Sequence, residues 1–179
     1  MTKKGKTILL TILGIIVVVV LFVGVSLWQS GVFSSPELKL ETRPAYLYIY
    51  LERSGPFSEI NKAKNDLQKM VKEQKLPVKT PCGVYFDDPA QSKNQQLRWR
   101  IGYTVEDSLT FSPPLKMDTI PAQRVIVASI KAHPMVAPFK TYPALEKWVA
   151  ENGYRITGPA YEFYYDDGLV EAMFPVEKR

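Results

Sequence analysis

The stretch that decides the fold is YEFYYDDGLVEAMFPV, residues 161–176. It predicts a β-hairpin, because Asp167-Gly168 separates two runs rich in β-branched and aromatic residues and readily forms a type I′ turn. Alternation along the first strand puts Glu162 and Tyr164 on one face, apart from the other aromatic residues. Such a carboxylate is either a solvated rim residue or a group that awaits a cationic or hydroxyl-bearing partner.

An earlier stretch, GVYFDDP at residues 83–89, resembles the first strand and turn of this hairpin and is also followed by a strand pattern, at 97–105. Each copy lies downstream of a Pro-Ala dipeptide, a long alternating β pattern and a helical pattern. We therefore expect an α+β domain built from a duplicated β-α-β-β unit. Repeat one covers residues 38–106, and repeat two covers residues 118–177.

In repeat one, tyrosines alternate with aliphatic residues between Tyr46 and Leu51. The aliphatic face needs a cover, and an amphipathic helix after Gly55-Pro56 supplies it. The tyrosine face is left for a ligand, or lies wet on the open side of the sheet. In repeat two, a second helix is expected to begin near Thr141 with that residue as its N-cap.

Composition restricts the classes of function. The chain has 179 residues, of which 46% are hydrophobic and 12% aromatic, so we expect one globular domain with an appendage. Three N-terminal lysines supply most of the net charge of +5 and no basic stripe stands out, so no nucleic-acid partner is expected. With one cysteine, Cys82, and one histidine, His133, we expect no disulfide, no metal site and no cofactor.

The N-terminus predicts a membrane anchor. A basic segment at 1–7 precedes an apolar run at 8–28, which as a helix measures roughly 31 Å, about the thickness of a bilayer core. A cleaved signal peptide is the alternative, but its apolar region is shorter, about 7 to 15 residues. Lysines before the span place the N-terminus in the cytoplasm and the domain outside it. Residues 29–37 form a short flexible linker.

Five motifs resemble one known family in their order along the chain: ERSGPFSEI (52–60), GVYFDDP (83–89), IPAQRVIVASIKA (120–132), LEKWVAENGYRITGPAYEFYYDD (145–167) and MFPVEK (173–178). The family is the gyrase-inhibitor-like small-molecule-binding domain, which is also the effector-binding half of multidrug-sensing regulators and is related to SOUL proteins. The resemblance covers residues 38–179. It implies a pseudo-twofold β-α-β-β repeat in one antiparallel sheet, with two helices on one face and the ligand cleft on the other.

The resemblance also implies a set of ligand-binding residues. A glutamate at the position of Glu162 lies at the bottom of the family's cleft and meets cationic, aromatic ligands. The expected walls are Tyr164, Tyr48, Tyr50, Tyr85, Trp99 and Tyr103. No helix-turn-helix pattern precedes the domain, so a role in transcription does not follow from the resemblance.

Three functions remain open at this stage. The first is a membrane-anchored module that binds a small apolar, cationic or aromatic ligand, with Glu162 as counter-charge. The second is a protein-interaction or scaffold domain with a vestigial cleft, and the third is a hydrolase that uses Glu162 and a pocket tyrosine. The order of span and domain also resembles membrane-anchored animal members of the family, receptors in autophagy of the endoplasmic reticulum. Their domain faces the cytosol, which is the alternative topology, and their function depends on a C-terminal tail that has no counterpart here.

Overall fold

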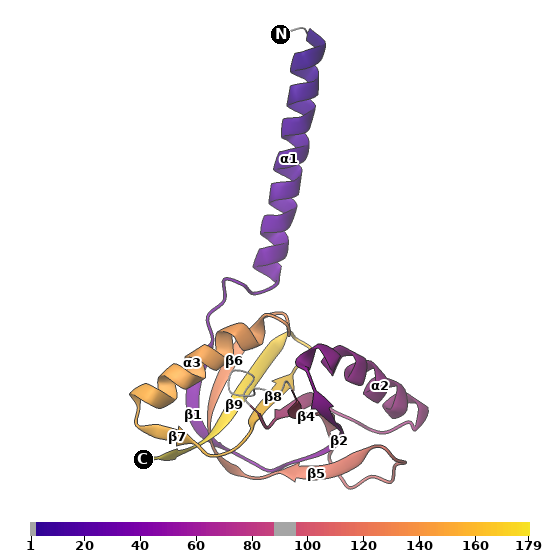
Figure 1. The fold of residues 1–179 in the computed structure, drawn as a ribbon, viewed down its shortest axis with the longest axis vertical. Coiled ribbons are helices and arrows are strands. Elements are labelled where there is room, and N and C mark those ends of the chain that lie inside the picture. Colours follow the sequence, from indigo (N-terminus) through magenta and orange to yellow (C-terminus); the bar gives the residue numbers. More distant parts are fainter. Residues whose placement is uncertain (1–2, 88–95) are drawn as a thin grey trace.

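The computed structural model describes residues 3–87 and 96–179 (Figure 1). Within them the chain forms three α-helices and nine strands, with a single 3-10 turn at Phe57–Glu59 before the second helix. In order they are α1 (Lys3–Gln29), β1 (Glu37–Arg43), β2 (Tyr46–Gly55), α2 (Ile60–Glu73), β3 (Pro81–Tyr85), β4 (Leu97–Thr104), β5 (Lys116–Ile120), β6 (Gln123–Lys131), α3 (Ala137–Glu151), β7 (Tyr154–Ile156), β8 (Ala160–Tyr164) and β9 (Leu169–Lys178).

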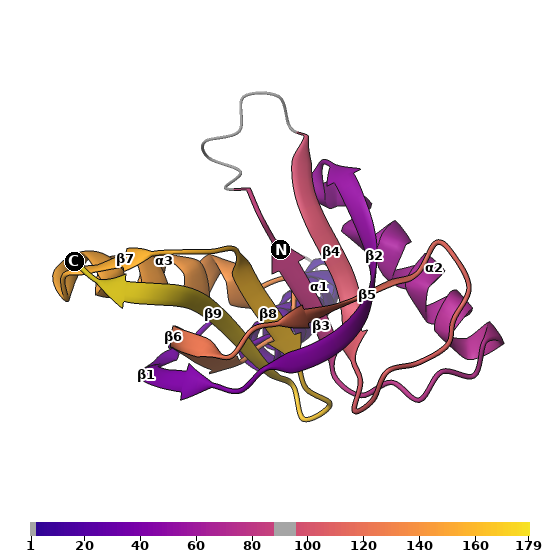
Figure 2. The same ribbon diagram turned by 90° about the horizontal axis from the view of Figure 1, so that it is seen from below.

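The strands form one antiparallel sheet in the order β1-β6-β9-β8-β3-β4-β2-β5, with β7 added beside β9. Seen from below, both α2 and α3 lie behind the sheet, so they cover the same face (Figure 2). The units β2-α2-β3-β4 and β6-α3-β8-β9 occupy the two halves of the sheet and meet where β3 pairs with β8. This arrangement confirms the predicted α+β fold with a duplicated unit.

The two halves exchange their outermost strands. Strand β1 leads directly into β2 but pairs with β6 of the other half, and β5 leads into β6 but pairs with β2. The crossings fall at Pro44 and Pro121, the two Pro-Ala dipeptides found in the sequence. Each half therefore lends an edge strand to the other, so neither half has a complete sheet by itself.

The hairpin of β8 and β9 forms as predicted, but with a longer turn. The backbone N–H of Tyr165 donates to the carbonyl of Leu169 at 2.9 Å, which closes a loop of residues 166–168. Gly168 has a φ of +79° and its N–H donates to the carbonyl of Tyr165 at 3.0 Å. This is the three-residue connection in which a type I turn precedes a left-handed residue, not the expected two-residue type I′ turn.

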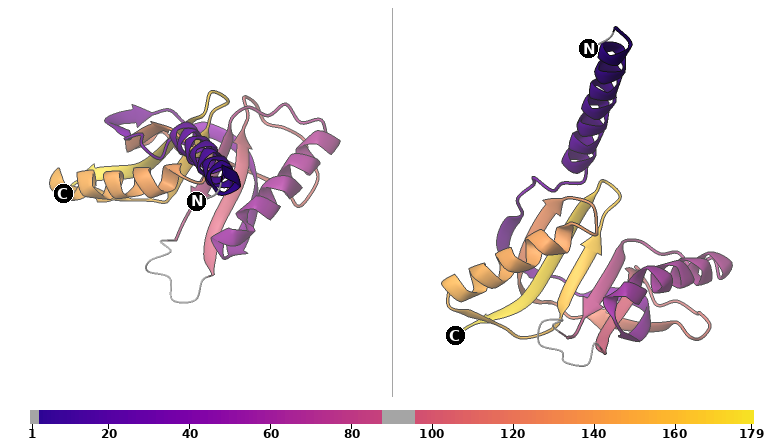
Figure 3. Two further views of the ribbon diagram at one scale, coloured as in Figure 1. Left: turned by 90° about the horizontal axis from the view of Figure 1, so that it is seen from above. Right: turned by 45° about the horizontal axis from the view of Figure 1, so that its top comes forward.

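Each helix covers its own half of the sheet. Helix α2 packs chiefly on β2 and β4, and α3 packs chiefly on β6 and β9. Leu51, Leu67 and Trp99 belong to the apolar cluster under α2, and Ile126, Leu145 and Phe174 to the cluster under α3. The central strands β3 and β8 consequently lie between the two helices (Figure 3).

Helix α3 begins one turn earlier than the sequence predicts. Its first residue is Ala137, and Thr141 is buried inside the helix instead of capping it. The Thr141 hydroxyl donates back to the carbonyl of Ala137 at 3.1 Å. A threonine hydroxyl satisfied in this way has no need of a capping position.

Helix α1 extends to Gln29, and its side chains from Ile12 onward are exposed. The linker that follows makes two contacts with the domain at its start. The His133 N–H donates to the carbonyl of Ser30 at 2.9 Å. Gly31, at a φ of +76°, lies so close to Ala132 that a Cβ would stand 2.6 Å from its Cα. The end of α1 is thus packed against the loop between β6 and α3.

Candidate functional site

Glu162 lies on the face of the sheet that carries the helices. It alternates along β8 with Tyr161 and Phe163, which belong to the apolar cluster on the opposite, open face. Ala160, which lies on the same face of β8 as Glu162, packs against the clusters beneath α2 and α3. The expectation of a cleft on the face away from the helices is therefore wrong for this carboxylate. The alternation within β8 was right, but the face on which Glu162 lies follows from the pairing of β8 with β3 and β9.

Five side chains from four elements meet above the middle of the sheet. The Tyr164 hydroxyl donates to Glu162 Oε2, and the hydroxyl of Tyr85 lies 3.4 Å from that of Tyr164. The Lys64 ammonium, from α2, lies 4.5 Å from the centroid of the Tyr164 ring. From α3, the Tyr142 hydroxyl lowers the pKa of the Glu162 carboxyl group as a hydrogen-bond donor. We call Lys64, Tyr85, Tyr142, Glu162 and Tyr164 the Glu162 cluster.

A glycine makes room for one of the rings. Gly83 of β3 is paired directly with Glu162 of β8. A Cβ at Gly83 would stand 2.8 Å from the Tyr85 hydroxyl and 2.9 Å from Cε2 of its ring. The absent side chain therefore lets the Tyr85 ring lie over the strand beside Glu162, where Phe57 meets it edge-on at 5.5 Å between centroids.

The Glu162 carboxylate is buried without a close cation. Its side chain is 3% exposed, and within the described residues it forms no ion pair shorter than 4.0 Å. Burial raises the pKa of Glu162 above its ordinary value of 4.5, and the hydroxyls of Tyr164 and Tyr142 with the charge of Lys64 oppose part of the rise. Burial in turn lowers the pKa of Lys64, against the pull of Glu162.

The tyrosines of the cluster remain hydrogen-bond donors. Burial, and after it the charge of Glu162, raise the pKa of Tyr85, Tyr142 and Tyr164 well above the ordinary value of 10.0. A neutral phenol donates one hydrogen bond, so these hydroxyls can solvate a carboxylate without neutralising it. The arrangement can therefore hold a buried negative charge and offer it to a cation lodged among aromatic rings.

The other predicted site residues lie on both faces of the sheet. Trp99 and Tyr103 share the helix-covered face with Glu162 and belong, with Tyr85, to the cluster beneath α2, where Trp99 is paired directly with Tyr85. Trp99 is fully buried and its indole N–H donates to the carbonyl of Gly55 at 3.2 Å, as a satisfied core residue does. Tyr48 and Tyr50 lie on the open face, which corrects their assignment to the wall around Glu162.

On that face, Arg100 contacts both Tyr48 and Tyr50. Its Nη1 donates to the Tyr48 hydroxyl at 2.9 Å, and its guanidinium lies 4.4 Å from the centroid of the Tyr50 ring. Arg100 is itself paired with Asp118 at 2.8 Å and Glu52 at 3.1 Å. The two rings therefore belong to a closed network of charges on the far side of the sheet.

Two members of the Glu162 cluster, Lys64 and Tyr142, were not among the predicted site residues. Both sit at the edge of the apolar stripe of their helix. Lys64 is four residues after Ile60, and Tyr142 is three residues before Leu145. A position at the edge of an apolar stripe predicts a side chain near the sheet. Only the arrangement of the helices over β8 shows that these two side chains lie near Glu162.

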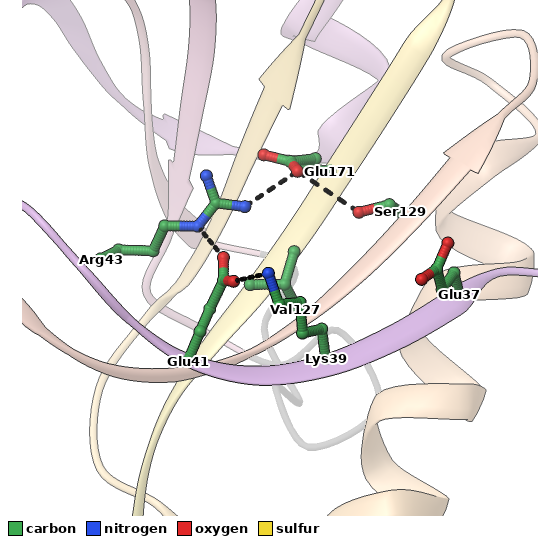
Figure 4. A pocket seen from close by; sticks show the side chains of 7 residues that line it. All are labelled: Glu37, Lys39, Glu41, Arg43, Val127, Ser129 and Glu171. Carbon is green, nitrogen blue, oxygen red and sulfur yellow. Dashed lines mark hydrogen bonds and ion pairs between the residues drawn. The ribbon is translucent and has the colours of Figure 1, made fainter.

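A hollow on the open face provides a contrast (Figure 4). Its lining is rich in charge: Glu37, Lys39, Glu41, Arg43, Val127, Ser129 and Glu171. Arg43 bridges Glu41 at 2.5 Å and Glu171 at 2.9 Å. Glu171 also accepts hydrogen bonds from Ser129 at 3.3 Å and Tyr165 at 2.9 Å. This carboxylate is satisfied within the protein, so the hollow makes a poor candidate for a ligand site.

Comparisons with known proteins agree on the domain. The model of the GyrI-like small molecule binding domain matches residues 36–177. A DNA gyrase inhibitor of Yersinia enterocolitica is 29% identical over 146 residues, covering 77% of this chain and 91% of the relative. The crystal structure of the EcmrR C-terminal domain superposes with a TM-score of 0.67 and 22% identity, covering 80% of this chain and 99% of that one. SAV2435 bound to tetraphenylphosphonium superposes with a TM-score of 0.53 and 11% identity, covering 79% and 94%.

Proposed function

Because the chain belongs to the family of GyrI-like small-molecule-binding domains, we propose that it binds a small apolar cation at the Glu162 cluster. The observation that carries the proposal is a buried carboxylate surrounded by tyrosines and without a close ion pair among the described residues. Burying an ionised carboxylate is unfavourable unless it is paired, so a ligand cation would relieve that cost. The organic cation bound by SAV2435, tetraphenylphosphonium, belongs to the same chemical class.

Lys64 marks where the positive part of the ligand goes. Its ammonium already makes the cation–π contact with Tyr164 that an organic cation would make. Glu162 is 3% exposed, so a ligand reaches the carboxylate only when the cluster opens, and we infer that Lys64 is the side chain that gives way. A lysine loses this competition readily, because its long stem reaches solvent from the edge of a helix and its ammonium regains hydration there.

We also propose that α1 anchors the domain to a membrane through residues 8–28, with residues 29–37 as the connection and the ligand-binding domain at 38–179. Among the described residues there is one helix, α1, that is both long enough and apolar enough to span a bilayer. The lysines ahead of it support a cytoplasmic N-terminus. A membrane-impermeant thiol reagent should then label Lys147→Cys, an exposed site on α3, in intact cells, while buried Cys82 stays unlabelled. Labelling only after lysis would place the domain in the cytoplasm.

Binding is tested by titrating tetraphenylphosphonium into the full-length protein in a non-ionic detergent. Glu162→Gln preserves shape and should weaken binding by about 1–3 kcal/mol, roughly 5- to 150-fold. Glu146→Gln, which removes the same charge from an exposed position on α3, is the matched control and should bind as the parent does. Equal affinities for all three proteins would refute the proposal and favour a scaffold role.

The same titration separates binding from catalysis. A carboxyl group with a raised pKa beside a tyrosine hydroxyl is also equipped for proton transfer. A binding module returns its ligand unchanged, so mass spectrometry should recover intact tetraphenylphosphonium and intact members of a panel of ester and strained-ring compounds. Turnover by the parent that disappears in Glu162→Gln would assign the hydrolase function instead.

A further inference from the structure

Three exposed apolar side chains come from segments that adjoin the end of α1. Outside α1, four large hydrophobic residues are exposed in the described part of the chain: Phe33, Met135, Phe139 and Ile156. Phe139 is 81% exposed, Phe33 69% and Met135 67%. These three belong to the linker, the β6–α3 loop and the first turn of α3, segments near the base of α1, whereas Ile156 belongs to β7, which follows the other end of α3 (Figure 1).

Backbone contacts join the segments that carry the three residues. The His133 N–H donates to the Ser30 carbonyl at 2.9 Å, which fixes the loop carrying Met135 against the end of α1. The carbonyl of His133 accepts the N–H of Ala137 at 3.0 Å, which starts the turn of α3 that carries Phe139. The patch is therefore built from the linker, the loop and the first turn of α3, all next to α1.

The direction of α1 relates this patch to the rest of the domain. Seen from above, α1 projects toward the viewer and α2 and α3 lie in front of the strands (Figure 3). Seen from below, the strands lie in front of all three helices (Figure 2). Helix α1 thus leaves from the face that carries α2, α3 and the Glu162 cluster. The open face, with its ion pairs around Glu171 and Arg100, points the other way.

We propose that Phe33, Met135 and Phe139 seat the domain on the surface of the bilayer that α1 enters. The inference rests on the proposed membrane anchoring, because α1 is what brings a lipid surface next to the patch. Aromatic and apolar side chains beside a span are favourable at the depth of the headgroups. We take lipid as the partner of these three residues because the bilayer that α1 enters lies next to them. Contact with the bilayer surface would cover all three.

Seating in this way turns the Glu162 cluster toward the membrane. An apolar cation concentrates at a lipid interface, where its charge meets headgroups and its rings meet acyl chains. The binding site would then collect such a molecule from the membrane surface instead of from bulk water. The face away from the helices, where the ion pairs of Arg43 and Arg100 lie beside the buried apolar cluster, would stay on the water side.

The test uses the full-length protein in phosphatidylcholine vesicles that contain a nitroxide-labelled phospholipid. An environment-sensitive fluorophore is attached at Met135→Cys, with Ile156→Cys as the matched exposed apolar control and Val18→Cys as the reporter for α1. Buried Cys82 is left in place. We expect lipid quenching at positions 135 and 18 and none at 156. Adding Phe139→Glu should abolish the quenching at 135 and leave that at 18.

The outcomes separate the two proposals. Quenching at position 18 without quenching at position 135 overturns the seating of the domain on the bilayer and keeps the anchor. Absence of quenching at both positions overturns the seating and the anchor, whatever ligand the protein binds. Quenching at 135 that survives Phe139→Glu attributes it to the tether and overturns the patch. A fluorescence shift at 135 without lipid quenching means that a second copy of the chain covers the patch, which also overturns the lipid assignment. Phe139 is exposed, so a melting curve like that of the parent is expected for Phe139→Glu.

Discussion

Glu162 and Glu171 lie on the paired strands of one hairpin, and both are almost fully buried, at 3% and 8% exposure. They point to opposite faces of the sheet. Glu171 meets Arg43 at 2.9 Å and accepts hydrogen bonds from Ser129 and Tyr165. Glu162 accepts a hydrogen bond from the Tyr164 hydroxyl, and the nearby Lys64 ammonium lies over the Tyr164 ring without an ion pair to the carboxylate. Burial alone therefore does not mark a functional carboxylate, and the partner at hand distinguishes the two.

The difference has an energetic meaning. A buried carboxylate with a guanidinium partner loses stability when its charge is removed, because the cation is left behind. A buried carboxylate without such a partner gains or keeps stability when it is neutralised. The hairpin thus carries one glutamate whose charge serves the fold and, by our proposal, one whose charge serves a ligand.

The largest expected effect is on stability. Glu171→Gln leaves Arg43 with Glu41 as its one ion-pair partner among the described residues and should lower the free energy of unfolding by about 2 kcal/mol, below the 3–5 kcal/mol typical of a fully buried pair. Glu162→Gln should be at least as stable as the parent. Urea unfolding of the three proteins decides this, and a greater loss for Glu162→Gln would reverse the assignment of the two glutamates.

A second prediction concerns the packing that supports Glu162. Gly83→Ala places a methyl group against the Tyr85 ring and should cost roughly 1–3 kcal/mol. Since the ring must move, affinity for tetraphenylphosphonium should fall as well. The control is the double variant Gly83→Ala with Tyr85→Ala, in which the clash is absent and the cost of the glycine replacement should nearly vanish. Additive costs in this cycle would show that Gly83 has a different role.

A third prediction concerns Lys64. Removing the competing ammonium with Lys64→Met should increase affinity for the cation by about 0.5–1 kcal/mol, roughly two- to fivefold. Lys69→Met, at an exposed position on the same helix, removes the same charge and should have no such effect. Weaker binding by Lys64→Met would mean that the lysine helps to hold the ligand instead of occupying its place.

The smallest effect is a dependence on pH. Because burial raises the pKa of Glu162 in the folded state, the protonated form is favoured there, and this contribution is fully present below about 4.5. It is lost as the pH rises through the folded pKa, so the stability of Glu162→Gln relative to the parent should increase over that range. Unfolding measured from pH 4 upward gives the difference. A difference that shrinks with rising pH would contradict a raised pKa.

Local patterns in the sequence were enough for the repeats and for much of the fold. The alternation in β8, the apolar stripe of α2 and the two Pro-Ala dipeptides depend on neighbours along the chain, and each corresponds to an observed feature. The exchange of β1 and β5 between halves depends on pairing across the sheet, which a local pattern does not contain. The same limit led to the wrong face for the cleft.

The site was predicted in part for a related reason. Glu162, Tyr164 and Tyr85 come from the hairpin and its earlier copy, so the repeat itself brings them together. Lys64 and Tyr142 come from the two helices. The sequence does not distinguish them from Tyr48 and Tyr50 as possible neighbours of Glu162. Only the placement of the helices over β8 and of Arg100 over the open face distinguishes these residues.

Titration of Glu162 itself tests most directly whether this carboxylate binds a cation. Carbon-13 NMR of the side-chain carboxyl, assigned with Glu162→Gln, reports its pKa in the full-length protein with and without tetraphenylphosphonium. We expect a pKa above 4.5 in the free protein that falls when the cation is bound, because a positive charge at the carboxylate favours its ionised form. A pKa at or below 4.5 that does not respond to the cation would contradict the proposal.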